Sequence, residues 1–510
     1  MAPKNRNLVL AAMIFAVGMT FIDQTIVSIA IPEMQRDLGL SSTGVQWVIN
    51  GYLLALAALF AFGGRVSDIF GHRRMVVIGV IVFTVASALN GAVPDGAIAE
   101  AWLITFRVLQ GVGAALMLPA ALAIVVGSFE LRERGKALAI FFAITGGLTS
   151  IGPIAGGYLS EWTWRAIFWI NVPIAIIALI LIATAKPENT RHPAPMDYRG
   201  LVLIVLGMGA SVLGFQQASE WGWDNPATWA CIVGGLALVV VFALVERRTE
   251  QPLIRVQIFQ TRAFTVENIV LFFAMVAFVP LFFFASMYSQ ISLGNSVSEA
   301  GLYLLTFFAG FAIASQFGGR MFDSAGAKVP VVVGCALGAV SFALWASHLT
   351  DLDYNSQWYF IVLAGAGIGL MLGPANTDAI NRAPQASYGE VSGITQTVRN
   401  YGASLGLAVL GTILIDQNRT NIEESLAGFD IPTSKADAIA QSLTQSNGGT
   451  QGGGFAEHAG AKATEVFEAV QLDFAKASRV VFFIMAGALV VAAVVALVGL
   501  QRGRQEALVE

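Results

Sequence analysis

The 510-residue sequence has little charge. Asp, Glu, Lys and Arg make up 12% of it, about half the share found in soluble globular proteins. This deficit excludes a soluble protein of several domains, because too few charged side chains are present to cover the surfaces of such domains. Apolar residues make up 56% of the chain, so the composition indicates a membrane protein. The net charge of −4 and the lack of a basic block argue against nucleic acid as a partner.

Cysteine and histidine are scarce as well. Cys231 and Cys335 lie in apolar runs and are predicted to be buried, small hydrophobic side chains. No two of the four histidines have metal-ligand spacing, so we predict no metal site. The sequence also lacks a G-x-x-x-x-G-K-[ST] loop, which argues against nucleotide hydrolysis. Any process that needs energy would then have to draw on an ion gradient, and no cofactor is expected.

About fourteen apolar segments are long enough to cross a bilayer, which takes about 20 helical residues. The even number places both termini on one side, and most of the 29 Lys and Arg fall in inner loops if that side is the cytoplasm. We therefore predict an all-α integral membrane protein with cytoplasmic N- and C-termini. The segments lie near residues 8–31, 44–63, 75–94, 99–126, 137–159, 166–185, 200–217, 227–246, 266–290, 299–318, 329–347, 358–380, 390–415 and 478–500.

A long polar stretch near 416–477, rich in glycine, separates the last two segments and is predicted to form an outer loop. Within it, Thr464–Lys476 has apolar residues at helical spacing. A solvated cap is the favoured interpretation, and a lid over the outer mouth is the alternative.

An internal repeat organises the chain. Gly64–Arg73 and Gly319–Lys328 both fit G-R-x-x-D-x-x-G-x-[RK], 255 residues apart. They follow the second and tenth segments, so two pseudo-symmetric six-helix bundles are expected, with segments seven and eight as an inserted central pair. The predicted parts are a bundle at 1–196, the insert and a linker at 197–260, and a bundle at 261–510. A duplicated bundle with a pathway between its halves is an alternating-access architecture.

The repeated loop has the chemistry of a conformational latch. Gly71 permits a tight turn, and Asp68 can accept hydrogen bonds from Arg73 or Arg74 or cap a neighbouring helix. Such contacts, made in one conformation and broken in the other, would form the latch; a plain charged turn is the alternative. The predicted latch comprises Gly64, Asp68, Gly71, Arg73 and Arg74, with Asp323 and Lys328 in the second copy.

Charge within a segment needs a reason, because it costs about 2.5–3.5 kcal/mol or more at a helix centre. Asp23 lies about 13 Å below the outer end of the first helix, and Arg107 about 9 Å below that of the fourth. Asn50 lies near the same level. We predict that Asp23 binds a proton or a cationic substrate and that Arg107 favours its ionised form or releases the proton. A purely structural hydrogen bond or salt bridge is the alternative for each residue.

Several of these stretches resemble the major facilitator superfamily, and specifically its fourteen-helix drug:proton antiporter branch. Gly64–Arg74 resembles the signature loop of the superfamily, although Ile69 and His72 stand where a basic residue is common. The resemblance covers nearly the whole chain except the long outer loop. Stretches that resemble the branch are Asp23–Pro32, Trp47–Leu54, Arg107–Gly113, Trp164–Arg165, Ile170–Pro173 and Arg399–Gly406.

The fifth segment resembles a motif regarded as the hallmark of antiporters. It contains Gly147, Gly152, Pro153, Gly156 and Gly157. Glycines allow close helix contact, and the proline removes a backbone donor. The functional interpretation is that this seam seals the inward-facing route and prevents leak; simple tight packing is the alternative.

Three residues of the second half complete the candidate set. Arg399 lies on the inner side of the thirteenth segment and is interpreted as an inner gate or a structural anchor. Tyr288 and Gln290 end the ninth segment in a pattern like that of the branch, which implies that they line the outer cavity.

The resulting prediction is a proton-coupled antiporter, not an enzyme, that exports amphipathic small molecules across a bacterial cell membrane. Its expected partners are that small molecule, protons and the lipid bilayer, and a bundle of this kind can work as a monomer. The alternatives are a facilitator, or a proton-coupled importer or exporter of a specific metabolite or lipid. A non-transporting membrane sensor or enzyme is the remote alternative, because no nucleophile–base set lies in the segments.

Overall fold

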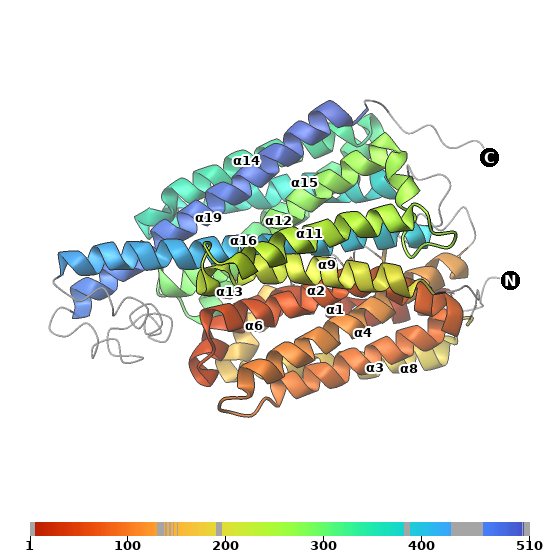
Figure 1. Cartoon of the computed structure of the whole chain (residues 1–510), viewed down its shortest axis with the longest axis horizontal. Coiled ribbons are helices and arrows are strands. Elements are labelled where there is room, and N and C mark those ends of the chain that lie inside the picture. Colours follow the sequence, from red (N-terminus) through yellow and green to blue (C-terminus); the bar gives the residue numbers. More distant parts are fainter. Residues whose placement is uncertain are drawn as a thin grey trace.

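The protein is a bundle of long helices, as its computed structural model shows (Figure 1). Thirteen helices in the described residues are long and apolar enough to cross a bilayer, and no strand occurs among those residues. The predicted all-α membrane fold is confirmed. The structure describes residues 6–129, 137, 140–141, 144–145, 147–149, 151–189, 196–381, 388–429, 463–501 and 503.

The N-terminal half supplies five of these spans. Part of the fifth predicted segment lies outside the described residues, and α6 is its described second part. The side chain of Ser41 caps α2 by accepting a hydrogen bond from the backbone of Gly44 at 2.9 Å. The helices are α1 (Arg6–Leu38), α2 (Ser42–Phe70), α3 (His72–Gly91), α4 (Ala99–Ser128), α6 (Ile151–Trp162), α7 (Ala166–Trp169) and α8 (Asn171–Ala185).

An inserted pair of helices follows, and its members pack against each other. Asp197 and Asn225 cap the starts of the two long helices, and Gly207 and Gly235 let the helices approach closely. Most apolar side chains of the second long helix are exposed, as expected for a surface in contact with lipid. The elements are α9 (Tyr198–Gln216), α10 (Ala218–Trp221), α11 (Pro226–Glu246) and the 3₁₀ helix η1 (Val256–Gln260).

Among the described residues, the C-terminal half contains six long spans and two short 3₁₀ turns. Ser296 and Glu299 form a capping box at the start of its second span, which fixes where that helix begins. The elements are α12 (Arg262–Ile291), α13 (Val297–Ala325), α14 (Lys328–His348), η2 (Leu349–Asp351), η3 (Tyr354–Ser356), α15 (Trp358–Asn381), α16 (Tyr388–Gly428) and α19 (Ala463–Gly499).

The repeat occupies equivalent positions in the two halves. Gly71 joins α2 to α3 with φ +102°, and Gly326 joins α13 to α14 with φ +79°. A residue with a Cβ atom would be strained at such φ values, so the glycine of the motif is required by the turn. Asp68 and Asp323 each lie in the last turn of the preceding helix.

The two ends of the bundle can be distinguished by the chain termini. The start of α1 and the end of α19 lie at one end, here called the termini end; the opposite end is the far end (Figure 1). Arg262, at the start of α12, donates to the carbonyl of Val498 near the end of α19 at 3.1 Å. Therefore α12 runs from the termini end to the far end, and α13 begins at the far end.

The stretch predicted as a long outer loop, near 416–477, differs from that prediction at both of its edges. Helix α16 continues to Gly428 and α19 begins at Ala463, and both project beyond the other helices at the far end (Figure 1). The polar composition concealed these turns, because only one side of each helix is apolar. The helical spacing predicted for Thr464–Lys476 is confirmed. The buried apolar residues of the two projections are Ile422, Leu426, Val466, Phe467, Val470 and Phe474.

Candidate functional site

A buried ion pair lies inside the N-terminal half. Asp23 of α1 is 0% exposed and Arg107 of α4 is 1% exposed, and Nη1 of Arg107 donates to Oδ2 of Asp23. Nε of Arg107 donates to the carbonyl of Val48 at 2.8 Å, and the guanidinium carbon lies 4.7 Å from the ring centroid of Tyr52. The residues predicted to lie at similar depth are therefore in direct contact.

Two amides complete the surroundings of the carboxylate. Gln110 donates to Oδ1 of Asp23 at 3.2 Å and accepts from Nη1 of Arg107 at 3.0 Å. Asn171 of α8 contacts the same Oδ1 at 3.5 Å and donates to Ser87 of α3 at 2.9 Å. A buried charge pair needs such additional hydrogen bonds to offset the cost of removing both charges from water. The pair is thus held from four helices.

Sequence reasoning found the pair but not its amides. Gln110 lies three residues after Arg107, which places it on the same helix face, and a polar residue at that spacing in an apolar run was the available signal. Asn171 comes from a distant helix, and nothing in the sequence spacing connects it with Asp23. Its place in the site depends on how α8 packs against α1.

Asn50 makes its described hydrogen bonds away from this pair. Its Nδ2 donates to Oε1 of Gln216 in α9 at 2.7 Å, and its Oδ1 accepts from the hydroxyl of Ser404 in α16. All three side chains are buried. The residue predicted to assist proton coupling therefore joins the N-terminal half, the inserted pair and the C-terminal half.

The glycines of α6 bring that helix against α1. A methyl group added at Gly156 would lie 3.0 Å from the carbonyl oxygen of Ile26, and one at Gly152 would overlap the side chain of Thr25. Thr25 also donates to the carbonyl of Thr149 at 2.9 Å. The added methyl at Gly147 would meet no described atom within 4 Å, so the close-packing argument does not extend to that glycine.

The same helix also contacts the C-terminal half. A methyl group at Gly157 would lie 2.9 Å from Cα of Ser298, and one at Gly301 would lie 2.5 Å from the carbonyl oxygen of Pro153. Ser298 and Gly301 are in the first turns of α13, at the far end. The predicted seam therefore runs along the interface between the two halves at that end.

Gln290 and Tyr288, near the end of α12, form hydrogen bonds with different parts of the molecule. Gln290 donates to the carbonyl of Ile29 in α1 at 3.1 Å, which is a second contact between the halves at the far end. Tyr288 donates to the carbonyl of Leu349 at 2.7 Å and accepts from Gln357 at 2.8 Å, inside the C-terminal half. Of the two residues predicted to line a cavity, Gln290 is at the interface and Tyr288 is not.

The predicted latch is built around His72. Asp68 lies 3.7 Å from Nε2 of His72, and Ser67 lies 3.1 Å from its Nδ1. The amide of Asn189 lies where a Cβ of residue 71 would be, which is a second reason for Gly71. A residue that departs from the usual signature, His72, therefore lies next to the aspartate of the motif.

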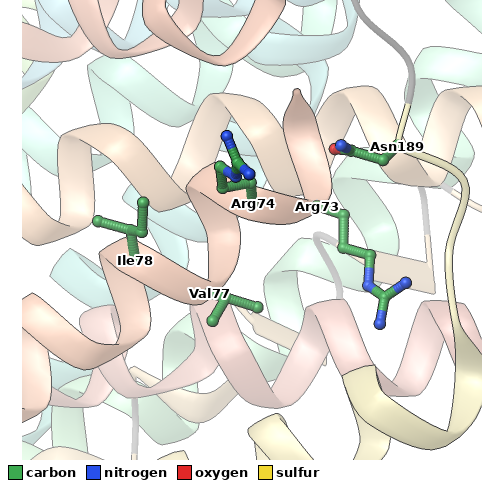
Figure 2. Close-up of a pocket in the computed structure, with 5 residues that line it drawn as sticks. All are labelled: Arg73, Arg74, Val77, Ile78 and Asn189. Atoms are coloured by element: carbon green, nitrogen blue, oxygen red, sulfur yellow. The ribbon is translucent and has the colours of Figure 1, made fainter. Parts of the chain in front are cut away.

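Arg73 and Arg74 line a cavity of about 280 Å³ at the termini end, together with Val77, Ile78 and Asn189. Figure 2 shows their guanidinium groups directed to different sides of the first turn of α3. In the part of the chain that the structure describes, neither arginine forms an ion pair.

Arg399 of α16 makes its described contacts within the C-terminal half. Its Nη1 donates to Gln396 at 2.7 Å and to Asn376 of α15 at 3.3 Å, and its Nη2 lies 4.0 Å from the sulfur of Met275 in α12. These partners belong to one half, whereas the predicted inner gate requires movement between the halves.

Comparison with known proteins decides the family. The sequence profile described as Major Facilitator Superfamily matches residues 13–407. The chain belongs to the major facilitator superfamily. It is therefore a multi-pass membrane transporter rather than an enzyme, and the predicted family is confirmed.

Curated relatives of this major facilitator superfamily member are drug resistance and export proteins of bacteria. The tetracenomycin C resistance and export protein of Streptomyces glaucescens is 32% identical, over 83% of this chain and 78% of the relative. The puromycin resistance protein pur8 of Streptomyces alboniger is 34% identical, over 79% and 80%. The multidrug transporter protein MdtP of Bacillus subtilis is 28% identical, over 86% and 81%.

Solved structures of the superfamily share the fold. A bacterial homologue of the human lysosomal transporter Spinster, in an inward-facing and unoccupied conformation, has a TM-score of 0.63 at 16% identity, and the match covers 97% of this chain and 96% of that one. A D-xylose–proton symporter has a TM-score of 0.57 at 12% identity, over 80% and 90%. These similarities concern the arrangement of the helices.

Proposed function

We propose that this transporter exports amphipathic small molecules in exchange for protons, and that Asp23 carries the proton. The observation that supports this proposal is the fully buried carboxylate of Asp23, held by Arg107, Gln110 and Asn171. An ionisable side chain inside a membrane-spanning helix is a functional site by default.

The contacts of Arg107 provide a way to exchange the ion pair for a proton. A proton on Asp23 removes the negative charge that Arg107 balances. Arg107 would still donate hydrogen bonds to the carbonyl of Val48 and the amide of Gln110, and its guanidinium would still contact the ring of Tyr52. All three groups are neutral. Protonation of Asp23 therefore weakens its link to Arg107 while leaving the arginine held in α4.

The position of Asp23 couples this exchange to the movement of the halves. Helix α1 carries Asp23 and also meets α6 at Ile26 and α12 at Ile29, near the far end. A shift of α1 on protonation would act directly on the contact between the halves at Ile29 and, through α6, on the contact of α6 with α13. The glycine seam of α6 then serves to close the route tightly and to prevent leak.

The direction of transport and the orientation follow from separate arguments. Relatives that are named for resistance and export support efflux as the direction. The excess of Lys and Arg at the termini end supports a cytoplasmic location of that end in a bacterial cell membrane. We propose that the His72–Asp68 contact at that end is a latch that breaks when the transporter changes conformation. Lys328 and Asp323 would form the latch at the equivalent position of the C-terminal half.

Export by purified protein in liposomes tests the proposal. Asp23→Asn should abolish export driven by a pH gradient, because the amide cannot carry the proton, while downhill exchange of substrate continues. Asp224→Asn, an exposed position between α10 and α11 and outside the site, is the matched control for loss of a carboxylate. Full export by Asp23→Asn under a pH gradient would contradict the proposal.

A further inference from the structure

Arg399 is a cation in a membrane-spanning helix that no described carboxylate neutralises. The two acceptors of its Nη1, Gln396 and Asn376, are neutral amides, and within the described chain no carboxylate oxygen lies within 4.0 Å of it. Arg107, the arginine within a spanning helix of the N-terminal half, has Asp23 as its partner. Among the described residues, the guanidinium of Arg399 therefore has no carboxylate partner, whereas that of Arg107 has one.

The unused edge of Arg399 is the side of its guanidinium formed by Nε and Nη2, and its orientation is defined. Nη1 is fixed by the two amides, so the plane of the guanidinium is oriented. Nε is buried and has no hydrogen-bond partner among the described residues, and Nη2 has the sulfur of Met275 at 4.0 Å. Nε–H and Nη2–H are parallel donors that match the two oxygens of a carboxylate. An oxygen acceptor at this edge would be expected of a purely structural anchor, and the described residues supply none.

Depth and neighbours point to a ligand rather than to solvent. Arg399 is eleven residues from the start of α16, which is about 16 Å along the helix. Met275, which covers the edge, has a flexible thioether side chain that can move aside. Phe278 lies one turn further along α12, and its ring stacks with that of Phe311 at 5.9 Å between centroids. An aromatic pair thus lies one helical turn from Met275, the residue next to Nη2 of Arg399.

We propose that this edge of Arg399 binds the carboxylate of the transported molecule, with the apolar body of that molecule placed against Phe278 and Phe311. The substrate class is then amphipathic organic acids. The inference rests on the proposed function, because it assigns a substrate class to the transporter. Arg399, Gln396 and Asn376 form the acid-binding part, and Met275 is the group that the acid displaces.

Binding of a matched pair of probes to purified protein in detergent tests this assignment. The probes are 4-(1-pyrenyl)butyrate and its methyl ester, which share an aromatic body and differ in the carboxylate. The wild-type protein is expected to bind the acid about tenfold or more tightly than the ester, because charge-assisted bidentate hydrogen bonds are the strong ones. Arg399→Gln should remove this preference and change the ester affinity less than twofold. Arg399→Lys, which keeps the charge but not the paired donors, should give an intermediate preference.

Arg479→Gln, which removes an exposed guanidinium from α19, is the matched control and should keep the full preference for the acid. If Arg399→Gln does not fold, Asn376→Leu replaces it, and a preference lowered about threefold is expected because Nη1 loses one acceptor. No preference in the wild-type protein, or an equal loss of acid and ester in Arg399→Gln, would overturn the assignment.

A transport measurement separates this inference from the proposed function. Liposomes with a pH gradient are loaded with each probe in turn. Export of the ester at the same rate as the acid would overturn the acid site and leave proton-coupled export standing. Preferential binding of the acid with no pH-driven export of either probe would overturn the proposed function and leave the acid site standing.

Discussion

At the scale of single residues, the central feature is a charge pair that the bilayer interior makes expensive and that four helices support. Asp23 and Arg107 have no access to water in this conformation, since both are buried. The amides of Gln110 and Asn171 satisfy the carboxylate. Because the net stability of a buried ion pair depends on its additional hydrogen bonds, we expect these amides to control how readily Asp23 would exchange Arg107 for a proton.

Gln110→Leu tests that control. The leucine removes a donor from Asp23 and an acceptor from Arg107, so the folded protein should lose about 1–3 kcal/mol of stability. Thermal unfolding in detergent and the pH dependence of export measure the two consequences. Thr105→Val, an exposed change in the same helix, serves as the control. An unchanged pH profile in Gln110→Leu would count against a role of this amide in coupling.

Residue-level reasoning from the sequence predicted part of this site. Counting residues along two antiparallel helices sufficed to place Asp23 and Arg107 at similar depth. It could not show which way Asn50 faces, because depth says nothing about rotation around a helix axis. The structure directs Asn50 to Gln216 and Ser404 instead. Asn171 was missed for a related reason, since its contact depends on packing between helices far apart in the sequence.

At the scale of helices, α6 is the element on which both halves meet. Its small residues face α1 on one side and the start of α13 on the other. Motif resemblance predicted a seam, and the packing shows which surfaces it joins. Apolar runs alone predict shorter helices than α16 and α19, because such a run ends where a helix becomes amphipathic.

Gly301→Leu tests the seam. Its side chain would meet the backbone of Pro153 in α6, which cannot move aside, so the contact between the halves at the far end should be weakened by about 1–3 kcal/mol. Export should fall and protons should leak through reconstituted protein without substrate. Gly487→Leu in α19 adds the same side chain where no described atom lies within 4 Å, and it should do neither. A tight, fully active Gly301→Leu transporter would rule out the sealing role.

At the scale of the whole molecule, the two halves and the inserted pair form one bundle, with the start of α1 and the end of α19 at one end (Figure 1). The repeat at a 255-residue offset predicted the two halves, and the glycine turns at Gly71 and Gly326 occur at equivalent places in both. The contacts of α9 with both halves could not be predicted, because the inserted pair has no counterpart in the repeat.

The accessibility of introduced cysteines tests the orientation of this bundle in the membrane. In a chain with Cys231 and Cys335 replaced by alanine, a cysteine at Asn355 of η3 should react with a membrane-impermeant maleimide on intact cells. A cysteine at Arg248, at the other end of the bundle, should react only after the cells are permeabilised. The reverse pattern would show that the termini lie outside and would contradict the use of the positive-inside rule here.

The most direct measurement of the central claim is the release of protons from purified transporter when a transported substrate is added in weakly buffered detergent solution. Proton-coupled exchange at Asp23 predicts release of protons from the wild-type protein, rising with substrate until the site is full. Asp23→Asn should bind the substrate and release none, because the proton that substrate binding displaces is the one on Asp23. Equal proton release by Asp23→Asn and by the wild-type protein would contradict the account.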